Sequence, residues 1–319
     1  MNANKKHSII FFGTPHIATE MLQTFIDLNV DIKAVVTKPD AFVGRKKEMI
    51  TPLVKQLANK YNIDVLQPQK LDTNFANQLE KYGAELFFVC AYGKIIPQSI
   101  LTIPKYKCVN LHTSLLPRWR GGAPIHWAII NSDIETGASL MYMTKELDAG
   151  DIIHQEAIPI NDDETYDSLY LKLCDLGKQI IKKKYIDLFA DNVKCTKQEA
   201  NMVSYAPNIT RKDEFIDWSK PARLIIRKIN GLYSKPIAST IYEGKPIKIF
   251  KASITNQKTV NHQPGTIISI DKKGIRIATI DYDIVFITIQ LPNKKPQAVS
   301  QLINGNHPFK ILTQFSNYR

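Results

Sequence analysis

The chain has 319 residues, of which 44% are hydrophobic and 23% are charged. This composition is that of an ordinary globular protein and excludes a fibrous repeat or a disordered chain. The formal net charge is +12, and the excess lies in the last third: residues 207–319 hold 18 Lys and Arg against 7 Asp and Glu, whereas residues 1–206 hold 24 against 23. A basic C-terminal part indicates either contact with a polyanion or simply a lysine-rich surface.

The length exceeds the roughly 100–150 residues of a typical domain, so we expect two domains. No apolar run approaches the ~20 residues of a membrane-spanning helix, and we expect no membrane contact. The cysteines are far apart and form no CxxC pair, which favours a reducing cytoplasm over a disulfide framework or a zinc site. They are Cys90, Cys108, Cys174 and Cys195.

The first half of the chain alternates apolar runs with amphipathic segments. Strands are expected at residues 8–14, 30–37, 63–68 and 84–93, and helices at 15–28, 49–62 and 74–83. Strands that are apolar on both faces and separated by helices predict a doubly wound, mainly parallel α/β sheet of the Rossmann-like type. The segment "FGTPHIA" after the first strand lacks the GxGxxG spacing, so a dinucleotide site is not supported.

Further along the chain, a strand is expected at Ile152–Pro159, followed by a long helix that opens after "NDDET" and ends near Lys182–Lys184. Acidic residues at its start and basic residues at its end match the helix dipole. The apolar face of this helix should consist of Leu169, Leu173, Leu176 and Ile180.

The last third has the pattern of short antiparallel strands. One short helix should precede hairpins that turn at Glu243-Gly244 and around Lys273-Gly274, and "DIVFITIQL" alternates apolar and mixed positions. Such strands predict a small OB-like β-barrel. The expected domains are therefore an α/β domain at 1–190, where catalytic groups are sought, a linker at 191–209, and a basic barrel at 210–319. Barrels of the OB type often bind nucleic acid, which supports the polyanion interpretation of the charge.

The stretch "VNLHTSLLPRWRGGAPI" places two polar residues on one face of an expected buried strand. The period of two sends Asn110 and His112 to one side and Val109 and Leu111 to the other. Polar groups at the carboxyl end of such a strand are either hydrogen-bonded structurally or serve a ligand in the crevice there. The Pro-Arg-Trp-Arg-Gly-Gly loop and the downstream carboxylate in "LDAGD" favour a site.

An imidazole, an amide and a carboxylate suit acyl-type transfer to an amine. The imidazole accepts the proton that the attacking nitrogen loses, the amide steadies the oxyanion, and the carboxylate orients the imidazole. A covalent serine mechanism is not indicated, because Ser114 does not lie in a GxSxG elbow.

The segments "FGTPHIA", "VCAYGKIIP", "VNLHTSLLPRWRGGAPI" and "LDAGD" together resemble the folate-dependent formyltransferases, in matching order along nearly the whole chain. The resemblance implies 10-formyltetrahydrofolate as the formyl donor and no metal. It also implies a catalytic trio and a folate-binding segment. The trio is Asn110, His112 and Asp148, and the folate segment is Ser114, Leu115, Leu116 and Pro117.

The acceptor depends on features outside this trio. The basic barrel and the loop "KPDAFVGRKKEMITP" are similar to the family members that act on methionyl initiator tRNA in translation initiation, so we expect tRNA contacts at Arg45, Lys46 and Lys47. The alternatives are an amino-sugar formyltransferase with the same donor and a non-catalytic RNA-binding module. The latter would leave the Asn-x-His and Asp constellation unexplained. We expect a cytoplasmic monomer.

Overall fold

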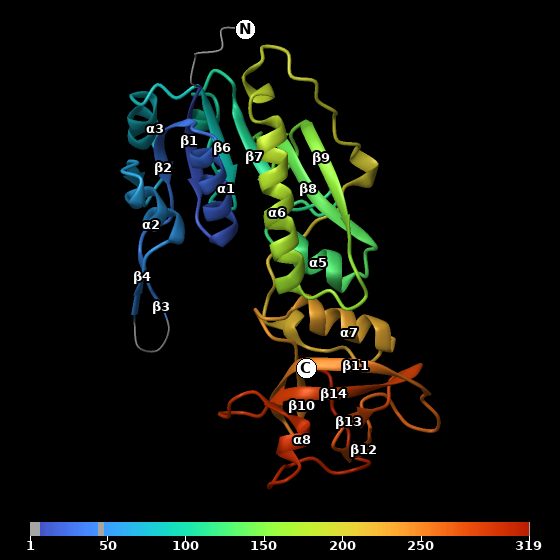
Figure 1. Ribbon diagram of the computed structural model, residues 1–319. Coiled ribbons are helices and arrows are strands. Elements are labelled where there is room, and N and C mark those ends of the chain that lie inside the picture. The colour runs from blue at the N-terminus through green and yellow to red at the C-terminus, as the bar shows by residue number, and fades with distance from the viewer. Residues whose placement is uncertain (1–6, 44–47, 319) are drawn as a thin grey trace. The chain divides into compact units, whose positions relative to one another are not determined.

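The computed structural model describes residues 7–43 and 48–318, and the chain divides into two units (Figure 1). Unit 1 consists of Met1–Gly122, Thr136–Ile158 and Leu171–Ala206. Unit 2 consists of Ala123–Glu135, Pro159–Tyr170 and Pro207–Arg319. Both units are therefore built from three separate segments of chain. Within the described ranges, no helix has both the length and the apolar composition needed to cross a membrane.

Unit 1 is built on a seven-stranded sheet with the order β5-β2-β1-β6-β7-β8-β9. The first five strands in this order pair in parallel, and β8 runs antiparallel to β7. The doubly wound, mainly parallel prediction is thus confirmed. The strands are β1 (Ser8–Gly13), β2 (Asp31–Val36), β5 (Val65–Leu66), β6 (Leu86–Cys90), β7 (Cys108–His112), β8 (Glu135–Tyr142) and β9 (Ile152–Pro159).

Aromatic side chains of β1 and β6 alternate between the two faces of this sheet. Phe11 and Phe88 stack on one face, where both rings meet Phe25 of α1 (His16–Asp27) edge-on. Phe12 and Phe87 point to the opposite face and belong to a buried cluster that includes residues of α3 (Thr73–Glu80) and α4 (Gln98–Leu101). Because both faces are covered, β1 is buried along its whole length.

The helices of unit 1 bury the faces that the sequence pattern predicts. Asp72 caps α3 by accepting a hydrogen bond from the backbone nitrogen of Phe75 at 3.1 Å. All four predicted core residues of α6 are buried, from Leu169 to Ile180. The helices are α1 (His16–Asp27), α2 (Leu53–Lys60), α3 (Thr73–Glu80), α4 (Gln98–Leu101) and α6 (Tyr166–Lys184), with short 3₁₀ turns η1 (Asp187–Phe189) and η2 (Ala200–Met202).

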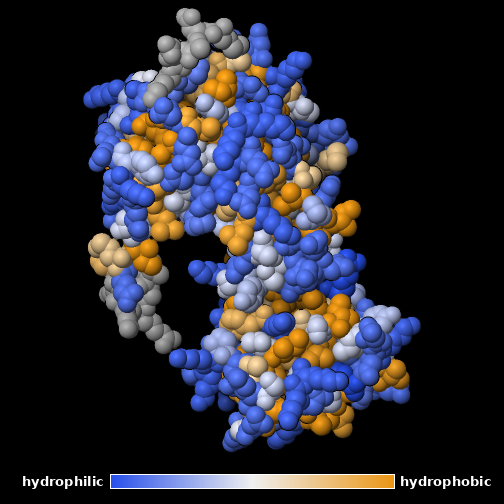
Figure 2. Space-filling model, in the orientation of Figure 1, coloured by the Kyte–Doolittle hydropathy of each residue, from blue (hydrophilic) through white to orange (hydrophobic). Residues whose placement is uncertain are grey.

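A small hairpin projects between β2 and α2. Its strands are β3 (Ala41–Val43) and β4 (Glu48–Ile50), which pair antiparallel. The side chains of Phe42, Met49 and Ile50 are more than half exposed. Figure 2 shows this apolar surface on the outside of the molecule.

Unit 2 contains an antiparallel sheet with the order β10-β11-β14-β13-β12, to which β15 adds beside β14. The last residues of the chain bridge both edges of this sheet, since Ser316 pairs with Ile241 of β10 and Gln314 pairs with Thr266, just before β12. The OB-like barrel prediction is thereby confirmed. The strands are β10 (Ser239–Tyr242), β11 (Lys245–Lys258), β12 (Ile267–Asp271), β13 (Gly274–Ile277), β14 (Tyr282–Gln290) and β15 (Gln297–Ala298).

A buried arginine fastens helix α7 to the other two segments of unit 2. Arg227 is 2% exposed, and its guanidinium donates to the main-chain carbonyls of Ile129, Asn161 and Asp133 at 3.2, 2.7 and 3.2 Å. These bonds satisfy a charge that burial would otherwise penalise. The helices of this unit are α5 (Pro124–Ile130), α7 (Ala222–Gly231) and α8 (Val299–Leu302), with a 3₁₀ turn η3 (Lys212–Glu214).

Candidate active site

Two polar side chains lie at the carboxyl end of β7, the central strand of the site. Asn110 and His112 are 8% and 7% exposed, while Val109 and Leu111 on the opposite face are buried in the apolar core. Gly177 of α6 packs against Leu111, and an added Cβ there would come within 2.8 Å of the leucine side chain. The alternation expected of this strand therefore turns the amide and the imidazole to the same side.

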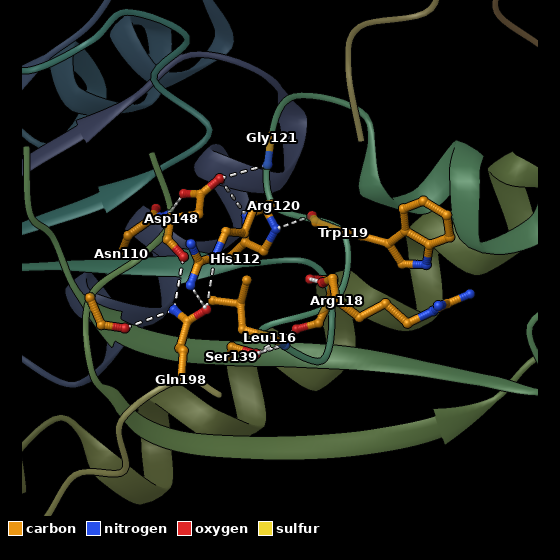
Figure 3. Close-up of polar contacts among 12 residues, drawn as sticks. Asn110, His112, Leu116, Arg118, Trp119, Arg120, Gly121, Ser139, Asp148 and Gln198 are labelled. Carbon is orange, nitrogen blue, oxygen red and sulfur yellow. Dashed lines mark hydrogen bonds and ion pairs between the residues drawn. The ribbon is translucent and has the colours of Figure 1, made fainter. Parts of the chain in front are cut away.

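Asp148 lies in the turn after β8 and reaches both of these side chains (Figure 3). Its Oδ1 lies 3.5 Å from the Asn110 Nδ2, and its Oδ2 lies 3.7 Å from the His112 Nδ1. Oδ2 also accepts a hydrogen bond from the backbone nitrogen of Gly121 at 2.9 Å. The three residues predicted to be catalytic are thus brought together from β7 and from the turn that follows the adjacent strand β8.

One hydrogen bond of the His112 ring indicates which of its nitrogens carries a proton. Nε2 lies 2.9 Å from the carbonyl oxygen of Trp119. Because a carbonyl can only accept, Nε2 must carry the hydrogen, and Nδ1 is then free to take a second proton. The Nδ1 to Asp148 distance is too long for a hydrogen bond and suits a carboxylate that stabilises an imidazolium.

The segment after β7 forms a tight loop held by its own polar groups. The Ser114 hydroxyl donates to the Arg118 carbonyl at 2.7 Å, and the backbone nitrogen of Leu116 donates to the Ser139 hydroxyl at 3.1 Å. Ser114 and Leu116 are buried, while Leu115 and Pro117 stay partly exposed. Of the four residues expected at the folate site, two therefore present side-chain surface and two shape the loop.

Gly150 explains why the "LDAGD" turn needs a glycine. A Cβ at this position would lie 1.8 Å from the carbonyl oxygen of Tyr142, closer than any real contact. Asp148 itself has a φ of +49°, in the left-handed region that Asp tolerates better than most residues. The close approach of the two backbones thereby places the Asp148 carboxylate next to β7.

One contributor to the site was not predicted from the sequence. The Gln198 side chain, from the segment that follows η1, donates to the carbonyl oxygens of Asp148 and Gly150 at 2.8 Å each. Its own Oε1 accepts from the Arg120 Nε and Nη2 at 3.0 and 2.8 Å (Figure 3). No periodic pattern surrounds Gln198, so the sequence carries no signal for these contacts.

Thiol chemistry has no support at this site. Cys108 begins the same strand as Asn110 and His112, and burial raises the pKa of its thiol well above the usual range. Burial likewise raises the pKa of Cys90 on β6. Both side chains are therefore protonated and apolar in character. In the described part of the chain, no three His, Cys, Asp or Glu residues cluster so that they could hold a metal ion.

The predicted tRNA-contacting residues Arg45, Lys46 and Lys47 lie outside the described residues. The base of their hairpin is fixed by polar contacts: the Lys55 ammonium donates to Asp40 at 2.9 Å, and the Gln67 amide nitrogen donates to the other Asp40 oxygen at 2.8 Å. Those two donors hold the pKa of the Asp40 carboxyl below its usual value.

Comparisons with known proteins match both parts of the chain. A family model described as formyl transferase matches residues 5–184, and one described as formyl transferase, C-terminal domain, matches residues 208–307. The methionyl-tRNA formyltransferase of Ureaplasma parvum is 43% identical over 305 residues, which cover 95% of this chain and 99% of the relative. The enzyme of the same name from Staphylococcus aureus is 40% identical over 299 residues, covering 93% and 96%.

A solved structure has the same fold. The N-formyltransferase from Helicobacter canadensis, in complex with folinic acid and dTDP-3-aminofucose, superposes with a TM-score of 0.69 over 88% of this chain and 98% of that chain. The two sequences are 22% identical, so this likeness bears on the fold alone.

Proposed function

The chain belongs to the formyl transferase family, and we propose that it transfers the formyl group of 10-formyltetrahydrofolate to the α-amino group of methionyl initiator tRNA. The observation that carries this proposal is the near-full-length similarity to methionyl-tRNA formyltransferases, which extends through the basic barrel. An amino-sugar acceptor has no comparable support.

The proposed reaction moves the formyl group from N10 of the folate to the acceptor amine, and one proton from that amine to N10. The amine attacks the formyl carbon, a C–N bond forms, and the bond from that carbon to N10 of the folate breaks. We assign His112 as the base that takes the amine's proton at Nδ1 and then returns it to N10. Asp148 stabilises the imidazolium between these two steps, because its carboxylate lies 3.7 Å away.

Asn110 is assigned to the oxyanion of the tetrahedral intermediate. Its amide nitrogen makes one long contact, at 3.5 Å, with Asp148, which leaves donor capacity for a developing negative charge. In a site this buried, such a donor contributes more than it would in water. The partly exposed side chains of Leu115 and Pro117 offer apolar surface to a folate ring.

The proposed contacts with tRNA are electrostatic. Arg45, Lys46 and Lys47 would meet phosphates of the acceptor stem, and the lysines of β11 would follow the rest of the stem. These lysines are Lys245, Lys248 and Lys251. The proposed substrate assigns the reaction to the cytoplasm, and we propose that the chain acts as a monomer.

The test is a direct assay of the reaction. The protein is incubated with 10-formyltetrahydrofolate and methionyl initiator tRNA, with elongator methionyl-tRNA in parallel, and formylmethionine is measured after deacylation. We expect formylation of the initiator alone. Absence of product with bound folate would contradict the tRNA acceptor and direct the search to amino sugars, while absence of folate binding would contradict the donor.

A further inference from the structure

The Gln198 side chain links the two loops that carry the site. Its amide group can donate two hydrogen bonds and accept two, and all four are made: two to the carbonyls of Asp148 and Gly150, and two from the Arg120 guanidinium. Its neighbours Lys197 and Glu199 are exposed, whereas Gln198 is partly buried. Of these three consecutive residues, only Gln198 is turned towards the site, and its full hydrogen-bonding capacity is used there.

These contacts close a ring around Asp148. The Asp148 carboxylate accepts from the backbone nitrogen of Gly121, Gly121 is bonded to Arg120, the Arg120 side chain donates to Gln198, and Gln198 donates to the Asp148 carbonyl. Such a ring restricts both ends of the aspartate. Figure 3 shows that its backbone carbonyl is bonded to Gln198 and its carboxylate to Gly121. We therefore expect these two bonds to fix its distance from His112.

The segment that contains Gln198 also bonds to Trp119, whose carbonyl contacts the Nε2 atom of His112. The Ser204 hydroxyl accepts a hydrogen bond from the backbone nitrogen of Trp119 at 3.0 Å, and the Ser204 carbonyl accepts from that of Arg120 at 2.9 Å. The backbone nitrogen of Ala206 donates to the Arg120 carbonyl at 2.7 Å. Residues 198–206 therefore fix Trp119, whose carbonyl accepts from His112.

We propose that residues 198–206 form a clasp of the active site in which Gln198 is a positioning residue, acting through Asp148 and Arg120 to set the Asp148–His112 geometry. This proposal rests on the proposed function, because its first test measures kcat for formylation of methionyl initiator tRNA. The hydrogen bonds of Gln198 go to two main-chain carbonyls and to Arg120, and not to the His112 imidazole or the Asp148 carboxylate. Its removal should therefore affect the rate of the chemical step and not the binding of either substrate. Misplacement of a catalytic group by about 1 Å can cost on the order of 100-fold in rate.

The first test compares Gln198→Met with Lys197→Met, an exposed neighbour in the same segment. We expect Gln198→Met to lower kcat about 10- to 100-fold with KM for tRNA and for the folate within about twofold of wild type. Lys197→Met should retain the wild-type kcat. Arg120→Met should reproduce the loss, and the double variant should lose no more than either single one, because both break the same link.

The second readout does not depend on activity. In protein labelled with ¹⁵N-histidine, the ring ¹⁵N shifts of His112 should move in Gln198→Met and stay unchanged in Lys197→Met. If Gln198→Met does not fold, Gln198→Glu keeps the acceptor for Arg120, loses both donors and should show the same changes. Wild-type kcat and wild-type His112 shifts in a folded Gln198 variant would overturn the proposal. A wild-type protein that formylates no tRNA would instead overturn the proposed function, with the NMR comparison still testing the clasp.

Discussion

Replacement of Asp148 by Asn isolates the charge of the carboxylate from its shape. Asn tolerates the left-handed φ of +49° as well as Asp does, and its side-chain oxygen can still accept from the Gly121 nitrogen. What is lost is the attraction between a carboxylate and an imidazolium 3.7 Å apart. At an effective dielectric constant of about 20, that attraction is ~4.5 kcal/mol.

This energy sets the expected loss of rate. Since each 1.36 kcal/mol corresponds to about tenfold, full loss of the attraction would lower kcat by roughly 10³-fold. The imidazolium is only partly formed in the transition state, so we expect a decrease of about 10²- to 10³-fold. The assay is single-turnover formylation of methionyl initiator tRNA at saturating folate, which separates the chemical step from product release.

His112→Asn is the matched control for this prediction. If the two residues act as a pair, the double variant should be no slower than His112→Asn alone, because the carboxylate has no imidazolium left to stabilise. Asp148→Asn with a rate within about threefold of wild type would refute the assigned role of the carboxylate, and fully additive losses would refute the pairing.

Three further changes test other parts of the molecule. Arg227→Met should lower the free energy of unfolding by about 3 kcal/mol or more, measured by urea denaturation, because three main-chain carbonyls lose the hydrogen bonds of a buried charged donor. Gly150→Ala should abolish most activity, because its methyl carbon would lie 1.8 Å from a main-chain oxygen; Gly305→Ala, whose nearest neighbour is 3.9 Å away, should be neutral in the same assay. Arg45→Ala should raise KM for tRNA and reduce the salt dependence of tRNA binding, without changing folate binding.

Each of these expectations has a contrary result. Unfolding of Arg227→Met within about 1 kcal/mol of wild type would show that water or a shifted backbone satisfies the carbonyls. Full activity of Gly150→Ala would mean that the turn can move without displacing Asp148. An unchanged KM for tRNA in Arg45→Ala would remove the hairpin from acceptor recognition.

Local patterns predicted most strands of the α/β sheet, its longer helices and the strand that carries Asn110 and His112. They missed the β3–β4 hairpin: the helix expected from residue 49 begins only at Leu53, because Glu48–Ile50 pairs as a strand with Ala41–Val43. The period of two placed Asn110 and His112 on one face, and the apolar face of α6 followed from its helical spacing. Such patterns can be read from the sequence because residues that share a face of a strand or helix recur at a fixed spacing. Asp148 was predicted only with the help of the family resemblance, because it lies 36 positions from His112 and no local pattern connects the two residues.

Contacts without a local pattern were not predictable in this way. The bond from His112 to Trp119 uses a main-chain carbonyl, which is present whatever the side chain. Gln198 reaches Arg120 across 78 residues, and nothing in its own segment repeats. The bridges of Gln314 and Ser316 to the edges of the barrel likewise depend on long-range pairing, which sequence periodicity does not encode.

The anchoring of α7 also bears on how this molecule can diverge in evolution. Arg227 binds Ile129, Asp133 and Asn161 through their carbonyl oxygens, so side-chain substitutions at those three positions keep its partners in place. Substitutions at the less buried Asp133 and Asn161 can therefore accumulate without releasing the helix, whereas Ile129 is also constrained by its buried side chain. A scaffold held in this way is free to alter the surface it offers to a macromolecular substrate while its internal attachment persists.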